Sequence, residues 1–590
     1  MTTTRPDLPL AQQDEEQEPR PADPAPGDRR SRGGRVLRRV AGLVVLLLAA
    51  VPAVLGTIGV LHDRGEPYLP FGDQAILELN VREVGTSDVL LGAYSRFGWY
   101  HPGPMLAYLL AVPFHAMDGA HEALAVGALA VAGISSVGAV FLVRRRLGLV
   151  VALWAVVVLT VTVRLLGDGF LRDSWNPYLP VLPLLAAALL CWTAVRGDAW
   201  ALPVAVVPMT LAVQSHVGYL PPVGAMGAVL AAGLLVRAGQ ARAGWRSGER
   251  PRDRRWLRWP VAVLAAVVVG LLLWLPPIAE QLTTTPGNLG LLADYFREGG
   301  TDGELSLARA LHAVADQFAL VPTYAAGDQP PTRLLLPAGW PVWAIVVGLV
   351  AFVAALANGV RRRRGDVVWL GVMTLAIGVS GVAAIVRLQG APFVYITRWT
   401  VVVGVLAWIT VGASLLPELV GLVRRVVGGA RSRVGPDVVV AVPLTALATA
   451  AVVVAGTAVA RAETPMTDTT GDIPRLEEAV LADLERAGLA GQDPVVRVDF
   501  PGTTRPGDII GTFWPGTGLV LELLRDGVDT QVAAFWVAPF GTRYTDRADD
   551  ADYVVTLAYS DGSSPPPAEW QRVLDVQGEL MVYGGVAPAQ

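Results

Sequence analysis

The sequence predicts a polytopic α-helical membrane protein with about eleven transmembrane helices and a small C-terminal α/β domain outside the membrane. Hydrophobic residues make up 53% of the 590 residues, and the mean hydropathy is +0.47. Apolar runs of about 20 residues recur along the chain, which is the length that a helix needs to cross a bilayer. After residue 460 these runs stop, and the composition becomes that of a soluble domain.

The N-terminal end predicts a cytoplasmic tail followed by a retained first span. Residues 1–34 are Pro-rich and charged, and they lack the apolar residues that could form a core, so we expect a disordered tail. The run Ala41 to Val60 is too long for a secretory signal and ends without a small-residue cleavage pattern. Three arginines precede it, which places the N-terminus in the cytoplasm by the positive-inside rule: Arg35, Arg38 and Arg39.

The remaining apolar runs lie at about 121–143, 147–166, 177–195, 199–214, 217–236, 259–278, 338–359, 367–386, 399–420 and 437–460. The arginine clusters between them all fall on the cytoplasmic side, provided that 104–117 does not cross: Arg144–Arg146, Arg196, 242–258, Arg361–Arg364 and the group from Arg424 to Arg433. That segment of about 14 residues begins with proline, so we expect a re-entrant or interfacial helix. The sequence therefore predicts a transmembrane domain over 35–460 of a multi-pass plasma-membrane protein, with outer loops 61–120 and 279–337.

The C-terminal segment 461–590 predicts an extracytoplasmic α/β domain. PRLEEAVLADLERAG is typical of a helix, PVVRVDF of a strand, and WPGTGLVLELLRDG of a turn and a helix. DTQVAAFWV and DYVVTLAYS are typical of strands. The domain shows no nucleophile or metal constellation, so we expect it to bind or orient an acceptor or to act as a structural cap.

The first outer loop carries a concentration of polar and aromatic residues. It contains FGDQAILELNVREVG, with Asp73 and Glu78, and then SRFGWYHPGP, with Arg96 and His101. Glu78, Arg96 and His101 are candidate substrate contacts. The aromatic residues suit a membrane interface, where an apolar ring and a polar tip are both satisfied. Asp73 is a candidate catalytic acid, but it could also be an exposed acid or an N-cap before AILELNV.

This loop resembles that of the GT-C superfamily of integral-membrane glycosyltransferases, in particular the protein mannosyltransferase and aminoarabinose transferase group. The resemblance rests on Asp73 and on the segment Tyr100–His101–Pro102–Gly103–Pro104, which leads into a membrane-surface helix. It implies a polyprenyl-phosphate sugar as donor, a glycan, lipid or protein of the cell envelope as acceptor, and Asp73 as general base. Members of that group often have Asp-Glu at this place, whereas Gln74 follows Asp73 here, so a second acid would come from elsewhere or be unnecessary.

Such a transfer needs a base for the acceptor hydroxyl and cations for the departing phosphate. Arg387 and Arg398 flank the link RLQGAPFVYITR on the outer side, against the positive-inside bias. They are candidate phosphate contacts or ordinary headgroup contacts, and Arg96 is a third candidate.

Two further polar segments interrupt the outer ends of spans. In GDGFLRDSWNPYLP, Asp173 could be a second acid or help to hold a divalent cation, although Asn176-Pro177 could equally be a capped span entry. In QSHVGYLPP, His216 could contact substrate or be a hydrogen-bonded structural histidine. HExxH and CxxC motifs are absent from the sequence, so no zinc site is expected, and the absence of a P-loop argues against an ATP-driven pump. No certain cofactor and no nucleic-acid partner is predicted.

Two other functions compete with glycosyl transfer. A polyprenol-linked glycan flippase or transporter would place charged residues near the bilayer midplane on repeated halves. A non-catalytic envelope-assembly protein would use the C-terminal domain as a binding module and would not need Asp73. In the second outer loop, LSLARALHAVADQFAL is either a gate over a donor cavity or an amphipathic surface helix.

Overall fold

The computed structural model describes residues 26–63, 68–86, 89–246, 258–298, 305–328, 335–427, 436–500, 512–559, 571–576 and 580–587. The chain divides into two units, residues 1–44 and 45–590, and the packed helices, the sheet and the candidate site all belong to the second. Helix α1 (Pro26–His62) begins inside the range predicted as a tail, and residues 1–25 of that tail lie outside the described residues.

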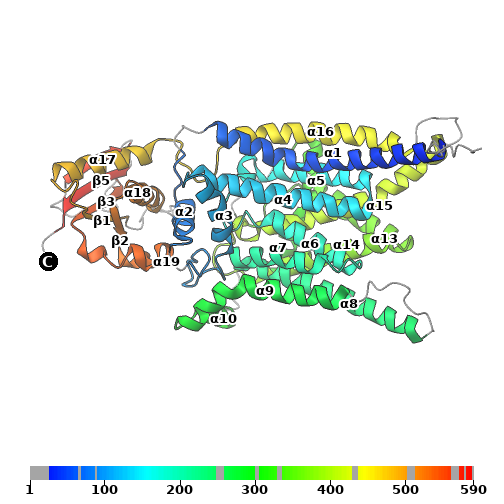
Figure 1. Ribbon diagram of the computed structural model, residues 1–590, viewed down its shortest axis with the longest axis horizontal. Helices are drawn as coiled ribbons and strands as arrows, with labels where there is room; N and C mark the ends of the chain where they lie inside the picture. Colours follow the sequence, from blue (N-terminus) through cyan, green and yellow to red (C-terminus); the bar gives the residue numbers. More distant parts are fainter. Residues whose placement is uncertain are drawn as a thin grey trace, which may run out of the picture. The chain divides into compact units, whose positions relative to one another are not determined.

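The predicted multi-pass helical architecture is confirmed (Figure 1). Among the described residues, nine helices are long and apolar enough to cross a membrane. They are α1, α4 (Glu122–Leu147), α5 (Leu149–Leu166), α8 (Leu220–Arg246), α9 (Arg258–Thr283), α13 (Val342–Arg361), α14 (Gly365–Val386), α15 (Val401–Val427) and α16 (Pro436–Arg461).

The two other expected spans are shorter than predicted. They correspond to α6 (Val181–Val195) and α7 (Ala201–Ser215), each of 15 residues. At 1.5 Å per residue such a helix is about 22 Å long, less than the roughly 30 Å of hydrocarbon. All residues of α6 are buried, so this helix faces protein and its length need not match the bilayer.

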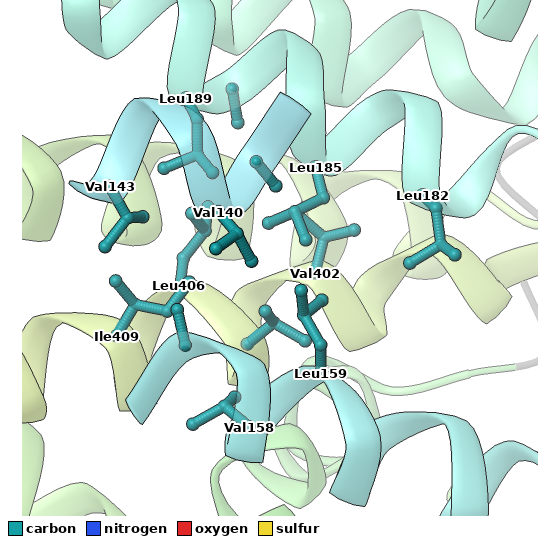
Figure 2. Close-up of a cluster of buried hydrophobic side chains, with 14 of the residues drawn as sticks. Val140, Val143, Val158, Leu159, Leu182, Leu185, Leu189, Val402, Leu406 and Ile409 are labelled. Atoms are coloured by element: carbon teal, nitrogen blue, oxygen red, sulfur yellow. The ribbon is translucent and has the colours of Figure 1, made fainter. Parts of the chain in front are cut away.

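The helices enclose a continuous apolar core. Figure 2 shows part of it, where side chains of four helices point toward one another: Val140 and Val143 of α4, Val158 and Leu159 of α5, Leu182, Leu185 and Leu189 of α6, and Val402, Leu406 and Ile409 of α15. These side chains are almost entirely buried. Within a bilayer, such side chains stabilise the contacts between helices by van der Waals packing rather than by transfer from water.

The described arginine clusters gather at one end of the helices. Arg146 lies 2.6 Å from Asp198 in the α6–α7 link, and Arg364 lies 2.7 Å from Glu418 of α15. Arg196 at the end of α6 lies 2.7 Å from Asp366 of α14. The ends of α4, α6, α13 and α15 are thereby joined on one side, as the predicted topology requires.

The opposite end carries the short helices α2 (Asp73–Glu83), α3 (Met105–Ala116) and α10 (Asn288–Glu298) (Figure 1). The second loop also contains the short helices α11 (Leu307–Ala315) and α12 (Leu320–Ala326). With 12 residues, α3 is about 18 Å long and too short to span. In the second loop, α11 packs on Ile385 of α14, and Trp408 of α15 donates to the Phe318 carbonyl at 3.0 Å. This segment is therefore packed into the helices rather than lying only on their surface.

The predicted C-terminal α/β domain is confirmed. Its elements are α17 (Asp472–Arg486), β1 (Val495–Asp499), α18 (Phe513–Arg525), β2 (Asp529–Val532), α19 (Val537–Phe540), β3 (Tyr553–Tyr559), β4 (Gln571–Val576) and β5 (Leu580–Val586). The strand order is β2-β1-β3-β5-β4. Strand β1 is parallel to both β2 and β3, whereas β5 is antiparallel to β3 and β4.

One predicted strand was too long, and a hairpin was missed. Only the first four residues of DTQVAAFWV form a strand, after which the chain turns into α19. The turn lets Trp536 pack on Phe500 and Phe513, with ring centres 5.0 Å away in each case. The β4–β5 pair was not expected from the sequence.

Helix α2 contributes to two apolar cores. Ala75, Ile76 and Leu79 belong to the core of the C-terminal domain, together with residues of α17, α18 and the sheet. Leu77 and Val81 belong to a different cluster with α3 and α4. The first outer loop and the C-terminal domain are therefore packed as one structure around α2.

Candidate active site

Asp73 is the first residue of α2, and its carboxylate is held by two donors from other segments. The Tyr94 hydroxyl donates to Asp73 Oδ1 at 2.8 Å, and Trp175 Nε1 donates to Oδ2 at 3.0 Å. The N-cap position is Gly72, not Asp73, so the capping interpretation is wrong. Burial raises the pKa of Asp73, and the hydrogen bonds from Tyr94 and Trp175 oppose this shift only in part.

Asp73 lines a narrow pocket with a cavity volume of about 40 Å³. Helix α2, the segment before SRFGWYHPGP, the start of α3 and the links around Trp175 and Ser215 form its wall. The lining residues are Asp73, Ile76, Leu77, Asn80, Leu91, Gly92, Ala93, Tyr94, Gly103, Pro104, Leu106, Ala107, Trp175, Asn176 and Ser215. An apolar wall with a few convergent polar groups is typical of a small-molecule site.

SRFGWYHPGP forms a tight hairpin that shapes this pocket. The Ser95 amide donates to the Trp99 carbonyl at 2.9 Å, and the His101 amide donates to the Ala93 carbonyl at 2.8 Å. A Cβ at Gly103 would lie 2.6 Å from both Gln214 Oε1 of α7 and Pro277 Cγ of α9, so a larger residue there would displace these side chains. The motif thus brings Tyr94 to Asp73 and lets α3 begin directly against α7.

A second carboxylate, Asp173, lies beside Gln74. The side chain of Asp173 is 3% exposed, and its Oδ1 accepts from Gln74 Nε2 and from the Trp175 amide, both at 2.9 Å. The Ser174 hydroxyl donates to Gln74 Oε1. Burial raises the pKa of Asp173 to about 7, against these hydrogen bonds and the charge of Arg398.

Trp175 therefore contacts both carboxylates, with its amide on Asp173 and its indole N–H on Asp73. Gln74 stands where the glycosyltransferases that the first loop resembles often have Glu. Its side-chain amide donates to a second acid, Asp173, from a different part of the chain.

The three candidate arginines differ in their surroundings. Arg398 Nη2 donates to the Leu166 carbonyl at 3.2 Å, and its guanidinium carbon lies 5.6 Å from the Tyr178 ring centre. Arg398 Nε is buried and has no hydrogen-bond partner within the described protein. Arg387 is exposed at the C-cap of α14. Of the three, Arg398 lies close enough to Asp173 to lower the pKa of that carboxyl.

Arg96 is exposed at the tip of the hairpin, with its guanidinium carbon 5.8 Å from the Phe393 ring centre. An aromatic series leads from there toward the pocket. Phe393 stacks on Tyr395 at 5.6 Å, and Tyr395 lies 4.9 Å from Trp175. Arg96 is thereby connected to Trp175, which donates to Asp73, through a series of ring contacts.

His101 and His216 form a buried pair, with ring centres 4.3 Å apart. His101 Nδ1 accepts from the Val217 amide at 3.1 Å, and His216 Nδ1 accepts from the Gly218 amide at 3.0 Å. Burial lowers the pKa of both, to about 4 for His216, and the neighbouring His216 adds to the effect on His101. Both rings are therefore neutral, and they join the first loop to the α7–α8 link.

Glu78 points away from the pocket. It is fully buried, its carboxylate lies 2.9 Å from Arg525 Nη1, and His121 Nδ1 is 2.8 Å away. Its partners come from the C-terminal domain and from the start of α4. Among the described residues, no group of three or more His, Cys, Asp or Glu side chains could hold a metal ion.

Sequence reasoning missed two residues of the site, Tyr94 as a partner of Asp73 and Trp175 as the link between the carboxylates. Trp175 follows Asp173 by two positions, and this Asp-Ser-Trp run was the available signal. It could not reveal that the indole reaches a residue 102 positions earlier in the chain.

No family model matches the sequence, and no match was found among curated proteins. The chain is similar in structure to ArnT from Cupriavidus metallidurans bound to undecaprenyl phosphate, at 14% identity over 94% of this chain and 98% of that chain, with a TM-score of 0.47. The apo state of the same protein gives 14% identity over 95% and 100%, with a TM-score of 0.45. The apo Archaeoglobus fulgidus oligosaccharyltransferase gives 12% over 88% and 70%, with a TM-score of 0.43.

These similarities extend over most of this chain. At these identities and TM-scores the likeness concerns the general fold. Donor, acceptor and catalytic residue have to be inferred from this chain's own side chains.

Proposed function

We propose that this protein transfers a sugar from a polyprenyl-phosphate donor to a cell-envelope acceptor at the outer face of the plasma membrane, with Asp73 as general base. The observation that carries the proposal is a half-buried carboxylate, oriented by Tyr94 and Trp175, on the wall of a pocket at one end of the transmembrane helices. The first-loop resemblance supports the class of donor.

The geometry suits proton abstraction from a hydroxyl. Tyr94 and Trp175 donate to different oxygens of Asp73, so the carboxylate is fixed while lone pairs remain for the acceptor. Because burial raises its pKa, Asp73 is a stronger base than an exposed Asp. The acceptor oxygen forms the bond to the anomeric carbon as the bond to the phosphate oxygen breaks, and the proton passes to Asp73.

The leaving group departs as a phosphate and needs positive charge rather than an acid. Arg398 is the strongest candidate because its Nε is buried without a partner among the described residues, and its charge acts on Asp173. Arg387 and Arg96 are exposed and are proposed as contacts to the phosphate or to lipid headgroups further out. A divalent cation stays possible beside Asp173.

The remaining candidates have supporting roles in this proposal. Asp173, whose pKa is raised to about 7, fixes Gln74 and offers a second acid for orienting the acceptor. His101 and His216 hold the hairpin against α7 and could contact substrate through their Nε2 groups. The buried ion pair of Glu78 favours a positioning role over substrate contact.

The placement of these residues favours a transferase over a transporter. Asp73, Asp173 and His216 lie in links or at helix ends rather than in the middle of the nine long helices. A flippase would be expected to place its charges near the midplane.

The test is incubation of the purified protein with radiolabelled polyprenyl-phosphate sugars and envelope acceptors. Asp73→Asn keeps the size of the side chain but cannot accept the proton, so turnover should fall by roughly 10²–10⁴-fold with donor binding retained. Asp168→Asn is the matched control, since Asp168 is paired with Arg164 away from the pocket. A folded Asp73→Asn protein that turns over at the parent rate would refute Asp73 as the base.

A further inference from the structure

The position of Asp73 depends on contacts that the C-terminal domain makes along the whole of α2. We propose that this domain positions the catalytic carboxylate, with Thr517 and Arg525 of α18 as the positioning residues. The inference rests on the proposed role of Asp73 as base. It assigns the domain a part in the reaction that is distinct from acceptor binding.

The first contact fixes the residue directly before Asp73. The Gly72 amide donates to Thr517 Oγ1 at 2.7 Å, and Thr517 is fully buried, with its own hydroxyl donating to the Trp514 carbonyl. Gly72 has φ 58° and ψ −136°, and a Cβ there would lie 3.3 Å from Trp514 Cδ1. The first turn of α18 therefore holds this backbone in a conformation that favours glycine.

The strand-like entry to α2 is fixed in the same way. The Phe71 amide donates to the Met466 carbonyl at 3.0 Å, and the Asp468 amide donates to the Leu69 carbonyl at 2.8 Å. The Phe71 and Trp514 rings lie 5.0 Å apart. The segment that enters the C-terminal domain thus pairs with the segment that delivers Asp73.

Arg525 fixes the middle of α2. Its Nη1 donates to Glu78 at 2.9 Å and to the Gly119 carbonyl at 2.8 Å. His121 bridges the same glutamate and Glu522, with its Nε2 3.2 Å from Glu522 Oε1. Because the Glu78 charge is buried, removing one partner leaves it incompletely paired and favours a shift of the helix.

The end of α2 is also held. The Tyr544 hydroxyl donates to Glu83 Oε1 at 2.8 Å, Arg543 pairs with the same carboxylate, and Arg82 Nη2 donates to the Leu524 carbonyl at 3.3 Å. Along its length, α2 buries Ala75, Ile76 and Leu79 in the core of the domain. Helix α2 therefore has little freedom to move independently of α18.

The donors to Asp73 come from elsewhere. Tyr94 belongs to the first-loop hairpin and Trp175 to the link before α6. The position of the Asp73 backbone is set by contacts with α18, whereas its carboxylate accepts hydrogen bonds from donors in the transmembrane part. A small displacement of α2 therefore lengthens these hydrogen bonds and changes how readily the carboxylate takes a proton.

The experiment compares Thr517→Val, Thr517→Ser and Arg525→Gln with two matched controls in the same domain. Thr530→Val removes a buried hydroxyl on β2, and Arg486→Gln removes an arginine 2.6 Å from Asp483. Turnover and donor KM are measured, and carbodiimide modification of Asp73 is followed against pH by mass spectrometry. Carbodiimides react with protonated carboxyls, so this profile reports the ionisation of Asp73 without requiring sugar transfer.

Thr517→Val should lower kcat by roughly 10- to 100-fold, with donor KM changed by less than about threefold, and should shift the pH profile of Asp73 modification. Thr517→Ser, which restores the acceptor for the Gly72 amide, should recover both values. Arg525→Gln should lower kcat and shift the pH profile of Asp73 modification in the same direction as Thr517→Val. The two controls should match the parent in both measurements.

Folded Thr517→Val and Arg525→Gln proteins with the parent's kcat and modification profile would overturn the positioning role. If transfer depends on Asp73 in that case, the proposed function stands alone. If the variants shift the modification profile while even the parent transfers no sugar, the positioning of Asp73 stands and the proposed function falls.

Discussion

The charge of His121 should make the junction between α2 and α18 sensitive to pH. Burial of the ring by itself lowers the pKa of His121, but hydrogen bonds to Glu522 and Glu78 outweigh it and raise the pKa to about 9. The imidazole lies 2.8 Å from Glu78 and 3.2 Å from Glu522, and its side chain is only 12% exposed. The pairing is therefore weakly screened by solvent.

The sign and size of this contribution to the free energy of unfolding follow from the folded and unfolded pKa values of His121. The unfolded His has a pKa near 6.5, so the stabilisation is fully present below that pH and is lost as the pH rises through 9. A rise from 6.5 to about 9 corresponds to roughly 3 kcal/mol. About 2 kcal/mol of this is present at pH 7.5, and almost none at pH 9.5.

The measurement is thermal unfolding of the parent and of His121→Gln in the same detergent at pH 7.5 and 9.5. Glu477 lies nearby, and its pKa is raised to about 7 by burial and then by the charges of Glu522 and Asp526. Glu477 is therefore mostly ionised between pH 7.5 and 9.5. The parent should exceed His121→Gln in stability at pH 7.5, and the gap should close at pH 9.5. His115→Gln is the control because the His115 ring hydrogen-bonds the Val84 carbonyl rather than a carboxylate. An equal gap at both pH values would refute the assigned charge.

Three other outcomes are expected. Arg398→Ala should weaken donor binding by about 1.5–3 kcal/mol, because the donor phosphate loses a charge-assisted partner. Arg387→Ala should weaken it less, because Arg387 is exposed. Unchanged donor affinity in both variants would mean that these arginines contact lipid headgroups instead. His101→Ala should reduce donor binding and turnover together, less steeply than Asp73→Asn, since the Val217 amide loses its acceptor; a selective loss of turnover would contradict this. Cysteines at Arg363 and Glu485 should be labelled from the cytoplasm and from outside, respectively, and labelling of both from one side would overturn the topology.

The long helices were predictable because each is set by a local property, an apolar run of sufficient length. The same holds for α17, α18, β1 and β3, whose apolar periodicity is visible within about ten residues. The β4–β5 hairpin was missed, and the strand over DTQVAAFWV was predicted too long because Phe535 and Trp536 continue its apolar pattern. Phe535 is 67% exposed, and this exposure depends on how Trp536 packs rather than on the local pattern.

The candidate site was predictable as a set of residues but not as an arrangement. Asp73 and Asp173 were both expected, whereas their connection through Gln74 and Trp175 joins segments about a hundred positions apart. Glu78 was predicted to contact substrate because it lies in the same loop as Asp73. Its partner Arg525 lies 447 positions later, and no spacing rule connects such a pair.

The shared core around α2 also separates two views of the C-terminal domain. If the domain were an independent binding module, it would keep its core when cut from the rest of the chain. Ala75, Ile76 and Leu79 supply part of that core, so an isolated 461–590 segment would expose the apolar surface that α2 covers. The membrane part, without the domain, would lose the Thr517 contact that fixes the backbone before Asp73. Neither half has a complete environment for the carboxylate, which favours a catalytic unit made of both over a scaffold with an appended module.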